Sequence, residues 1–139
     1  MSKYIQLLLL ANLIISCDPS YRADIINQSD KQITLIFKYD EKSTSTNFER
    51  KIGFIPNLID DNEGSKIIFK SDTINFIITA HVQPNDTLFM EMGIGTHPNF
   101  KNIDKIIIYS ADTVILDTKY EMLNAFDENY RYQYELIIK

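Results

Sequence analysis

Short segments in which apolar and polar residues alternate are the feature of this 139-residue chain that most constrains its fold. Side chains of a β-strand point alternately to its two faces, so this pattern predicts strands with one buried and one solvated face. The longest such segments are residues 32–39, 74–82, 86–92 and 130–139. The shorter strands that we expect are 23–27, 50–55, 66–70, 104–109 and 113–116.

The segments between these strands carry turn-forming residues, as in 27–30, 60–64 and 83–86. Ser110-Ala111-Asp112 predicts a tight hairpin between 106–109 and 113–116. Only residues 118–126 look helical. Thr118 and Glu121 have the spacing of a capping box, and an apolar helical face is expected from Tyr120, Leu123 and Phe126.

Many short strands with little helix predict an all-β fold, an antiparallel β-sandwich of about seven to nine strands. We expect it to be immunoglobulin-like or jelly-roll-like, with one short helix before the last strand. A closed barrel is the alternative. The chain shows no internal repeat and no second domain, so the sandwich is expected to occupy residues 23–139, after a short tether over 17–22.

The first residues have the pattern of a secretory signal peptide. Lys3 supplies a positive charge, and residues 5–15 are apolar except for Gln6 and Asn12. This stretch suits the apolar region of a signal peptide and is shorter than the ~20 residues needed to span a bilayer. It is followed at once by Ser16 and by Cys17, the only cysteine of the chain.

Ile14-Ile15-Ser16-Cys17 resembles the lipobox of bacterial lipoproteins. The resemblance implies that residues 1–16 are a signal peptide cleaved between Ser16 and Cys17. It also implies that the Cys17 thiol receives a diacylglyceryl group and that the new amine is acylated. Two or three acyl chains anchor a protein durably in a membrane. The alternative is that residues 7–15 form a buried strand or helix and Cys17 an inert core thiol.

The many Ile, Asn and Lys residues, together with the lipobox, resemble small lipoproteins of Bacteroidetes-type bacteria. This resemblance implies a cell-envelope location, which we expect to be the outer membrane. Asp18, the residue after Cys17, does not decide which membrane holds the protein or which side of it the domain faces. In enterobacterial lipoproteins an Asp at this place favours inner-membrane retention, whereas in the Bacteroidetes scheme acidic residues after the cysteine favour surface export.

The net negative charge of the chain argues against two classes of partner, nucleic acid and anionic lipid. The net charge is −5, and it becomes −6 when residues 1–16 and their Lys3 are removed, which leaves 123 residues. An acidic chain without a basic cluster argues against nucleic acid as a partner, because such binding needs neutralised phosphates. It also argues against electrostatic docking on anionic lipid, so the lipid anchor is the expected membrane contact.

Two features could suggest metal binding. His81 and His97 lie sixteen residues apart with no cysteine nearby, which is too few ligands for a zinc site, and we expect surface histidines and no metal. The loop Asp60 to Gly64 has the oxygen density of a calcium loop, but its twelfth position is Ser71 instead of Glu. A solvated turn is expected there, with a weak calcium site as the alternative.

Two further patterns have both a structural and a functional interpretation. Gly93-Ile94-Gly95 lacks the third glycine of a dinucleotide-binding loop, so we expect a bend or bulge after the strand 86–92. Tyr130, Tyr132 and Tyr134 form an aromatic stripe. It is expected to be the buried face of the last strand, and the alternative is a surface that stacks on sugars or peptides.

No Gly-x-Ser-x-Gly elbow or other placed nucleophile occurs, so we nominate no catalytic residue and no cofactor. The preferred hypothesis is a membrane-anchored, non-catalytic binding or assembly module with an envelope protein or glycan as its partner. One alternative is an envelope enzyme that hydrolyses a polymer with two carboxyl groups in a cleft, roughly 5–9.5 Å apart. Another is an inhibitor or immunity-type lipoprotein.

Overall fold

The computed structural model describes residues 18–40, 62 and 65–139. Nine strands and one short helix lie within these residues. They are β1 (Ser20–Asn27), β2 (Ile33–Tyr39), β3 (Ile68–Asp72), β4 (Ile77–Val82), β5 (Thr87–Ile94), β6 (Ile103–Tyr109), β7 (Thr113–Leu116), α4 (Lys119–Ala125), β8 (Asp127–Tyr130) and β9 (Gln133–Ile138).

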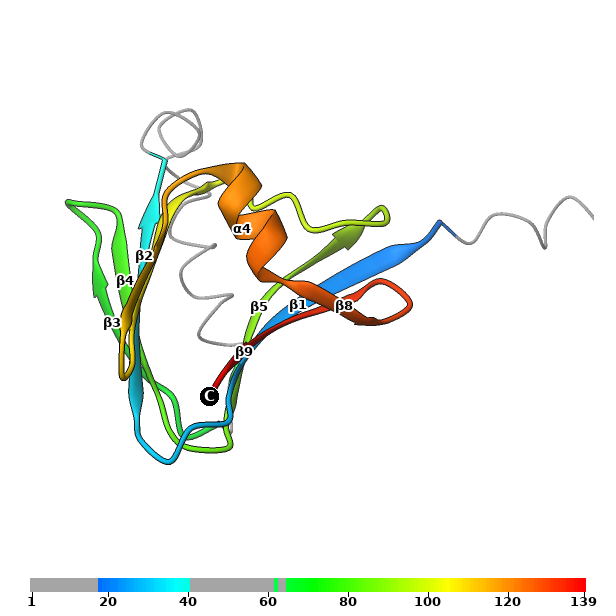
Figure 1. The fold of residues 1–139 in the computed structure, drawn as a ribbon. Helices are drawn as coiled ribbons and strands as arrows, with labels where there is room; N and C mark the ends of the chain where they lie inside the picture. The colour runs from blue at the N-terminus through cyan, green and yellow to red at the C-terminus, as the bar shows by residue number, and fades with distance from the viewer. Residues whose placement is uncertain (1–17, 41–61, 63–64) are drawn as a thin grey trace, which may run out of the picture.

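The strands form two packed sheets, which confirms the predicted β-sandwich (Figure 1). Sheet A has the order β5-β1-β9-β8, and sheet B has the order β3-β4-β2-β6-β7. Neighbouring strands run antiparallel except β1 and β9, which run parallel, a pairing that we did not predict. In Figure 1 the sheets approach each other at their lower ends, and α4 crosses the upper end between them.

Alternate residues of the central strands build the core between the sheets. Strand β2 buries Ile33, Leu35, Phe37 and Tyr39, while Ile36 on its other face is only half-buried. The other strands contribute in the same way, through Tyr21, Ala23, Ile25, Ile78, Ala80, Val82, Leu88, Met90, Ile106 and Ile108. Each fully buried large aliphatic or aromatic side chain contributes roughly 1.5–3 kcal/mol, so the burial pattern fixes which residues face outward.

Two expected strand boundaries are wrong. Strand β1 begins at Ser20, which pairs with Ile94, so residues 20–22 belong to sheet A instead of a tether. Strand β4 begins at Ile77, and Ile74 is 85% exposed in the preceding turn. The Asp72 carboxylate accepts a hydrogen bond from the Ile74 N–H at 3.1 Å, and this turn interrupts the alternation. The expected strand 50–55 lies outside the described residues.

The segment 130–139, expected to be one strand, is interrupted by a hairpin turn. Strands β8 and β9 pair antiparallel across Arg131-Tyr132, and Tyr132 has a φ of 63°. The Glu128 carboxylate supports the turn by accepting the Tyr132 N–H at 2.9 Å. Tyr134 is therefore a core residue as expected, whereas Tyr130 is 72% exposed on β8. The three tyrosines do not form one stripe.

The capping box of α4 is present as predicted. The Thr118 hydroxyl accepts the Glu121 N–H at 3.1 Å, and the Glu121 carboxylate accepts the Thr118 N–H at 3.1 Å. The expected apolar face is right for Phe126, which is buried, and wrong for Tyr120 and Leu123, which are exposed. Met122 is the buried residue of α4. No helix in the described part of the chain has the length and apolarity needed to cross a membrane.

Candidate functional site

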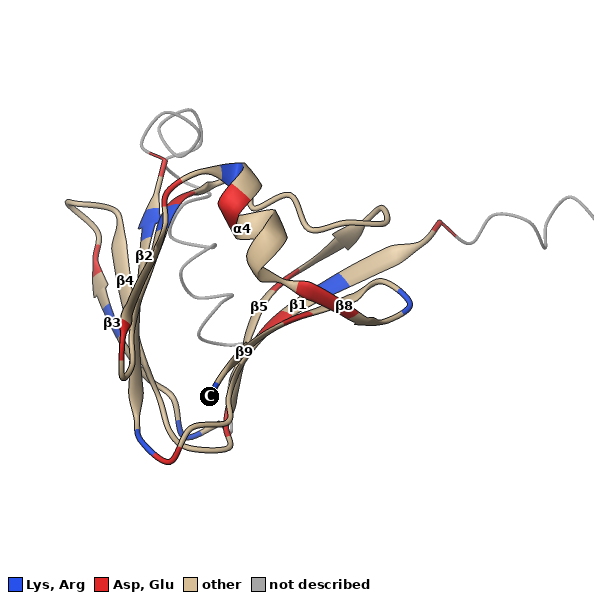
Figure 2. Cartoon of the chain, in the orientation of Figure 1, with Lys and Arg blue, Asp and Glu red and all other residues tan. Residues whose placement is uncertain are grey.

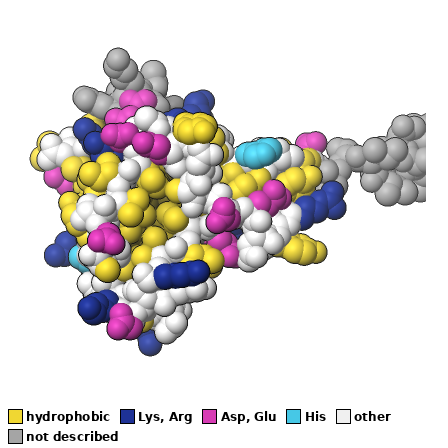
Figure 3. All heavy atoms as spheres, viewed as in Figure 1, with side chains coloured by type: hydrophobic (Ala, Val, Ile, Leu, Met, Phe, Trp, Pro, Cys, Tyr) yellow, Lys and Arg dark blue, Asp and Glu magenta, His cyan; other side chains and the backbone are white. Residues whose placement is uncertain are grey.

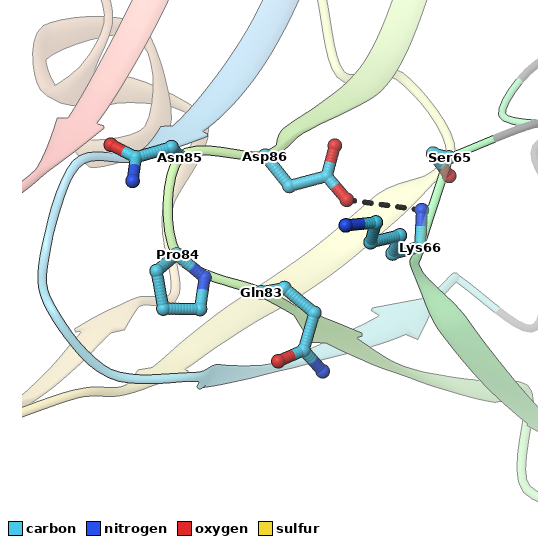
Figure 4. A pocket seen from close by; sticks show the side chains of 6 residues that line it. All are labelled: Ser65, Lys66, Gln83, Pro84, Asn85 and Asp86. Carbon is cyan, nitrogen blue, oxygen red and sulfur yellow. Dashed lines mark hydrogen bonds between the residues drawn. The ribbon is translucent and has the colours of Figure 1, made fainter.

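A polar pocket lies where the turn between β4 and β5 meets the segment before β3. It encloses about 680 Å³, and Figure 4 shows its lining of Ser65, Lys66, Gln83, Pro84, Asn85 and Asp86. The Asp86 carboxylate accepts the backbone N–H of Lys66 at 3.1 Å and that of Thr87 at 3.0 Å. Because both of its oxygens accept backbone donors, this carboxylate serves to hold the turn.

A second pocket of about 400 Å³ contains two carboxyl groups, those of Asp40 and Asp104. Asp40 follows the end of β2 and Asp104 lies near the start of β6. These ends meet because β2 and β6 pair antiparallel, and the Asp40 N–H donates to the Asn102 carbonyl at 2.9 Å. Sequence reasoning nominated neither residue, since only this pairing brings them together.

The outer face of sheet B carries a row of isoleucines among its polar residues. We call it the sheet B face. Its central row, in register across three strands, is Ile36, Ile107 and Ile115. Ile115 is 52% exposed, and Ile68 and Tyr109 on the same face are 56% and 45% exposed. Antiparallel sheets normally place polar residues on the face turned to water, and a contiguous apolar patch there marks an interaction site.

The charges on the sheet B face are mainly positive. Lys38 lies directly opposite Lys105 in the register of β2 and β6. Lys70 adds a third cation. Asp72 and Asp104 add two anions, and Asp104 lies beside Lys38 where the register of β2 and β6 shifts, which leaves one net positive charge on this face of an acidic chain. Like charges directly opposite each other destabilise a strand pair. An anionic partner over Lys38 and Lys105 would relieve this repulsion.

The sheet B face ends at the edge strand β7, which has no charged residue. The other edges of the described sheets are protected. Strand β8 carries Asp127 and Glu128, and β3 carries Lys70 and Asp72. The edge of β5 bonds to the Asn62 amide, which donates to the Phe89 carbonyl and accepts the Phe89 N–H. Uncharged edges favour pairing with another chain, so β7 extends the candidate surface.

The loop between β5 and β6 is held by two charged side chains, those of Glu91 and Lys119. The Glu91 carboxylate accepts the N–H of Asn99 at 3.0 Å and that of Phe100 at 3.2 Å. The Lys119 ammonium donates to the carbonyls of Phe100 and Ile103, and burial lowers the pKa of Lys119. Burial and the nearby Glu91 charge raise the pKa of Tyr21. These contacts fix the loop and have a structural role.

The two histidines lie apart. His81 is half-buried on the sheet B face, with its Nδ1 3.0 Å from the Thr34 hydroxyl. His97 lies in the loop after β5, where its ring packs 5.9 Å from that of Tyr134. Within residues 18–40, 62 and 65–139, no three His, Cys, Asp or Glu side chains are grouped so that they could hold a metal ion.

The expected bend after the strand is present at Gly95, directly after β5, whereas Gly93 has a different structural reason. Gly93 lies within β5, and a Cβ there would be 2.6 Å from the Tyr21 hydroxyl oxygen. Gly95 has a φ of 129°, which disfavours other residues. The irregular register of β5 instead falls opposite Ala23 and Asp24.

Two groups of predicted site residues lie outside the described part of the chain. They are Ser16 with Cys17, and the loop Asp60 to Gly64 apart from Asn62. The Asn62 amide bonds at both ends to the backbone of Phe89, so in this structure it holds the edge of β5. The predicted lipidation and the alternative calcium site stay predictions.

Comparison of the chain with family models, with curated proteins and with solved structures finds no match. Inference about its function therefore starts from the surfaces described above.

Proposed function

We propose that this chain is a lipid-anchored, non-catalytic binding or assembly module of the bacterial cell envelope, with the sheet B face as its binding surface. The anchor is Cys17, acylated after cleavage of the signal peptide, in the outer membrane. The observation that carries the proposal is the outward-facing row of half-buried Ile36 and Ile107 and exposed Ile115, bordered by lysines and continued by the uncharged edge of β7.

The chemistry of the sheet B face favours a protein as the partner. Protein interfaces combine an apolar centre with a polar rim, as the isoleucine row and the lysines do here. A glycan site would offer flat aromatic rings, and the strands contribute only Tyr109 to this face. An inhibitor or immunity-type lipoprotein would use the same surface, so this alternative differs in the identity of the partner.

Photo-crosslinking in intact cells tests the surface. A benzophenone amino acid at Ile115 should give a discrete protein adduct, because Ile115 lies in the apolar row. The matched control is Tyr120, which is 77% exposed on α4 and therefore more accessible than Ile115. Equal adduct yields from both positions, or none from Ile115, would contradict the proposal.

The anchor has a separate test. A Cys17→Ser variant should lose incorporation of radiolabelled fatty acid and should keep residues 1–16. Normal maturation and continued membrane attachment of this variant would show that the lipobox interpretation is wrong.

The pocket that holds Asp40 and Asp104 favours the polymer hydrolase as a second candidate. Acid–base cleavage of a glycosidic bond needs two carboxyl groups in one concave site. Hydrolysis of a cell-wall polymer by the wild type, lost in Asp40→Asn and Asp104→Asn but retained in Asp117→Asn, would establish it. A wild type that releases no soluble sugar would remove this candidate.

A further inference from the structure

We infer that the partner of the sheet B face is the outer face of sheet A on a second copy of this chain, so that copies associate head to tail. This inference rests on the proposed function and names the partner of the same surface. It is argued from the charges and apolar side chains of the two outer faces.

The outer face of sheet A, called the sheet A face below, carries a row of carboxylates. Asp24 of β1 lies opposite Glu135 of β9, and Glu135 lies opposite Asp127 of β8. Arg22 pairs with Asp24 at 2.6 Å, so the face keeps two net negative charges. Figure 2 shows acidic residues on β8 and on the neighbouring strands of this sheet.

The sheet A face also exposes large apolar side chains. Met92 and Ile94 near the end of β5 are 69% and 81% exposed, and Ile137 of β9 is 40% exposed. The sheet B face in the same way combines its apolar row with the paired lysines Lys38 and Lys105 and one net positive charge. Figure 3 views the sandwich from its side, so the hydrophobic side chains at its centre lie between the two sheets and not on either outer face. Each outer face thus combines apolar residues with a row of like charges, and the two rows are opposite in sign.

Stacking of the two faces would remove the like-charge repulsion on both. The ammonium groups of Lys38 and Lys105 would meet the carboxylates of Glu135 and Asp127. Pairing of two sheet B faces would instead bring lysines against lysines. Head-to-tail contacts produce rings or open chains of copies.

The contact between a sheet B face and a sheet A face is small in area, so we expect its affinity to depend on salt. Five strands spaced about 4.8 Å apart span only about 20 Å, so each face is smaller than a standard interface. Association in solution should then be weak and should weaken with salt, because the charges are exposed. Confinement of anchored copies to one membrane would raise their effective concentration.

Sedimentation velocity of the full-length protein in detergent, at low and high salt, tests the inference. One variant reverses the sheet B face (Lys38→Glu with Lys105→Glu), and a second reverses the sheet A face (Asp127→Lys with Glu135→Lys). The control, Lys31→Glu with Lys101→Glu, changes two exposed lysines outside both faces. Thermal unfolding checks each variant, and Lys38→Gln with Lys105→Gln replaces the first variant if it fails to fold.

The wild type should form concentration-dependent oligomers that dissociate at high salt. Each reversal should weaken this association at least tenfold, an equimolar mixture of the two reversals should restore it, and the control should behave as wild type. Carbodiimide treatment of a mixture of isotopically distinct copies gives a further test, because it joins an amine directly to a nearby carboxylate. A link between two copies, from Lys105 or Lys38 to Glu135 or Asp127, would support the stacked faces directly.

A wild type that stays monomeric at about 100 µM and low salt, where even weak contacts are populated, would overturn the inference. Unchanged association of the sheet A reversal would also overturn it, because the sheet B face would then meet something else. A monomeric wild type whose Ile115 still crosslinks to a different protein in cells would overturn this inference and leave the proposed function standing. Absence of that adduct would remove the proposed surface as well.

Discussion

Replacement of Asn27 should destabilise the fold more than its small size suggests. Asn27 ends β1 and is completely buried. Its amide nitrogen donates to the carbonyls of Lys31 at 2.8 Å and Val82 at 3.0 Å. Its amide oxygen accepts the N–H of Ser29 at 3.1 Å and the Ser29 hydroxyl at 2.7 Å. One side chain therefore connects both sheets and the turn between β1 and β2.

Asn27→Ala removes these four hydrogen bonds and leaves buried carbonyls with fewer partners. At about 1 kcal/mol net for each bond, we predict a loss of about 3–4 kcal/mol in the free energy of unfolding. Asn27→Asp keeps the volume, but an ionised carboxylate cannot donate to the carbonyls of Lys31 and Val82. Burial beside these carbonyls would raise the pKa of the new carboxyl, so Asn27→Asp should be less destabilised at pH 4 than at pH 7.

Urea unfolding followed by circular dichroism measures these losses. With an m-value of about 1.5 kcal/mol/M, a loss of 3 kcal/mol lowers the midpoint by about 2 M. The control is Gln28→Ala, because Gln28 is exposed next to Asn27 and should change stability by less than about 0.5 kcal/mol. A loss below about 1 kcal/mol for Asn27→Ala would refute the reasoning, because the four bonds would then contribute little.

Three further predictions concern stability. Gly93→Ala should lower the free energy of unfolding, measured in urea, by about 1–3 kcal/mol, because the new Cβ meets the Tyr21 ring. Tyr21→Leu in the same chain should recover part of this loss, and purely additive free-energy changes of the two variants would contradict the prediction. Burial raises the pKa of Tyr39 above its usual 10.0, so stability should be full below pH 10 and fall at higher pH. Tyr39→Phe should reduce this fall in melts at pH 9 and 11, whereas Tyr120→Phe should leave it unchanged. Thr118→Ala should lower the free energy of unfolding by about 1 kcal/mol through loss of the α4 cap, and an unchanged melting temperature would count against that role.

The fold class and several local structures could be predicted from the sequence because they depend on local patterns. Alternation placed the core residues of β2 correctly, and the spacing of Thr118 and Glu121 located the start of α4. The hairpin at residues 110–112 also formed as predicted. These features depend on side-chain direction and on hydrogen bonds between near neighbours, which a short segment determines by itself.

Other features depend on contacts between distant segments, which no local pattern reveals. The alternation of Tyr130, Tyr132 and Tyr134 continues through a turn, in which Tyr132 has a positive φ. The sequence did not reveal this turn because tyrosine is not a typical turn residue. The face of α4 was misjudged because Met122, and not Tyr120 or Leu123, meets the core.

The candidate surfaces needed the strand register. Lys38 and Lys105 are neighbours only because β2 pairs with β6, and Asp24 meets Glu135 only through the parallel pairing of β1 with β9. The uninterrupted apolar run of residues 106–109 was a signal that both faces of β6 are apolar. The sequence predicted β7 as one neighbour of β6 but did not indicate that β2 lies on its other side.

A benzophenone scan in intact cells tests the central claim, that the sheet B face is the binding surface, most directly. The scan places the probe at Ile68, Tyr109 and Ile115 on that face, and at the exposed controls Tyr120 and Leu123 of α4 outside it. The account predicts the same protein adduct from all three positions on the face and none from the controls. Adducts confined to the controls, or no adduct from the face, would contradict it.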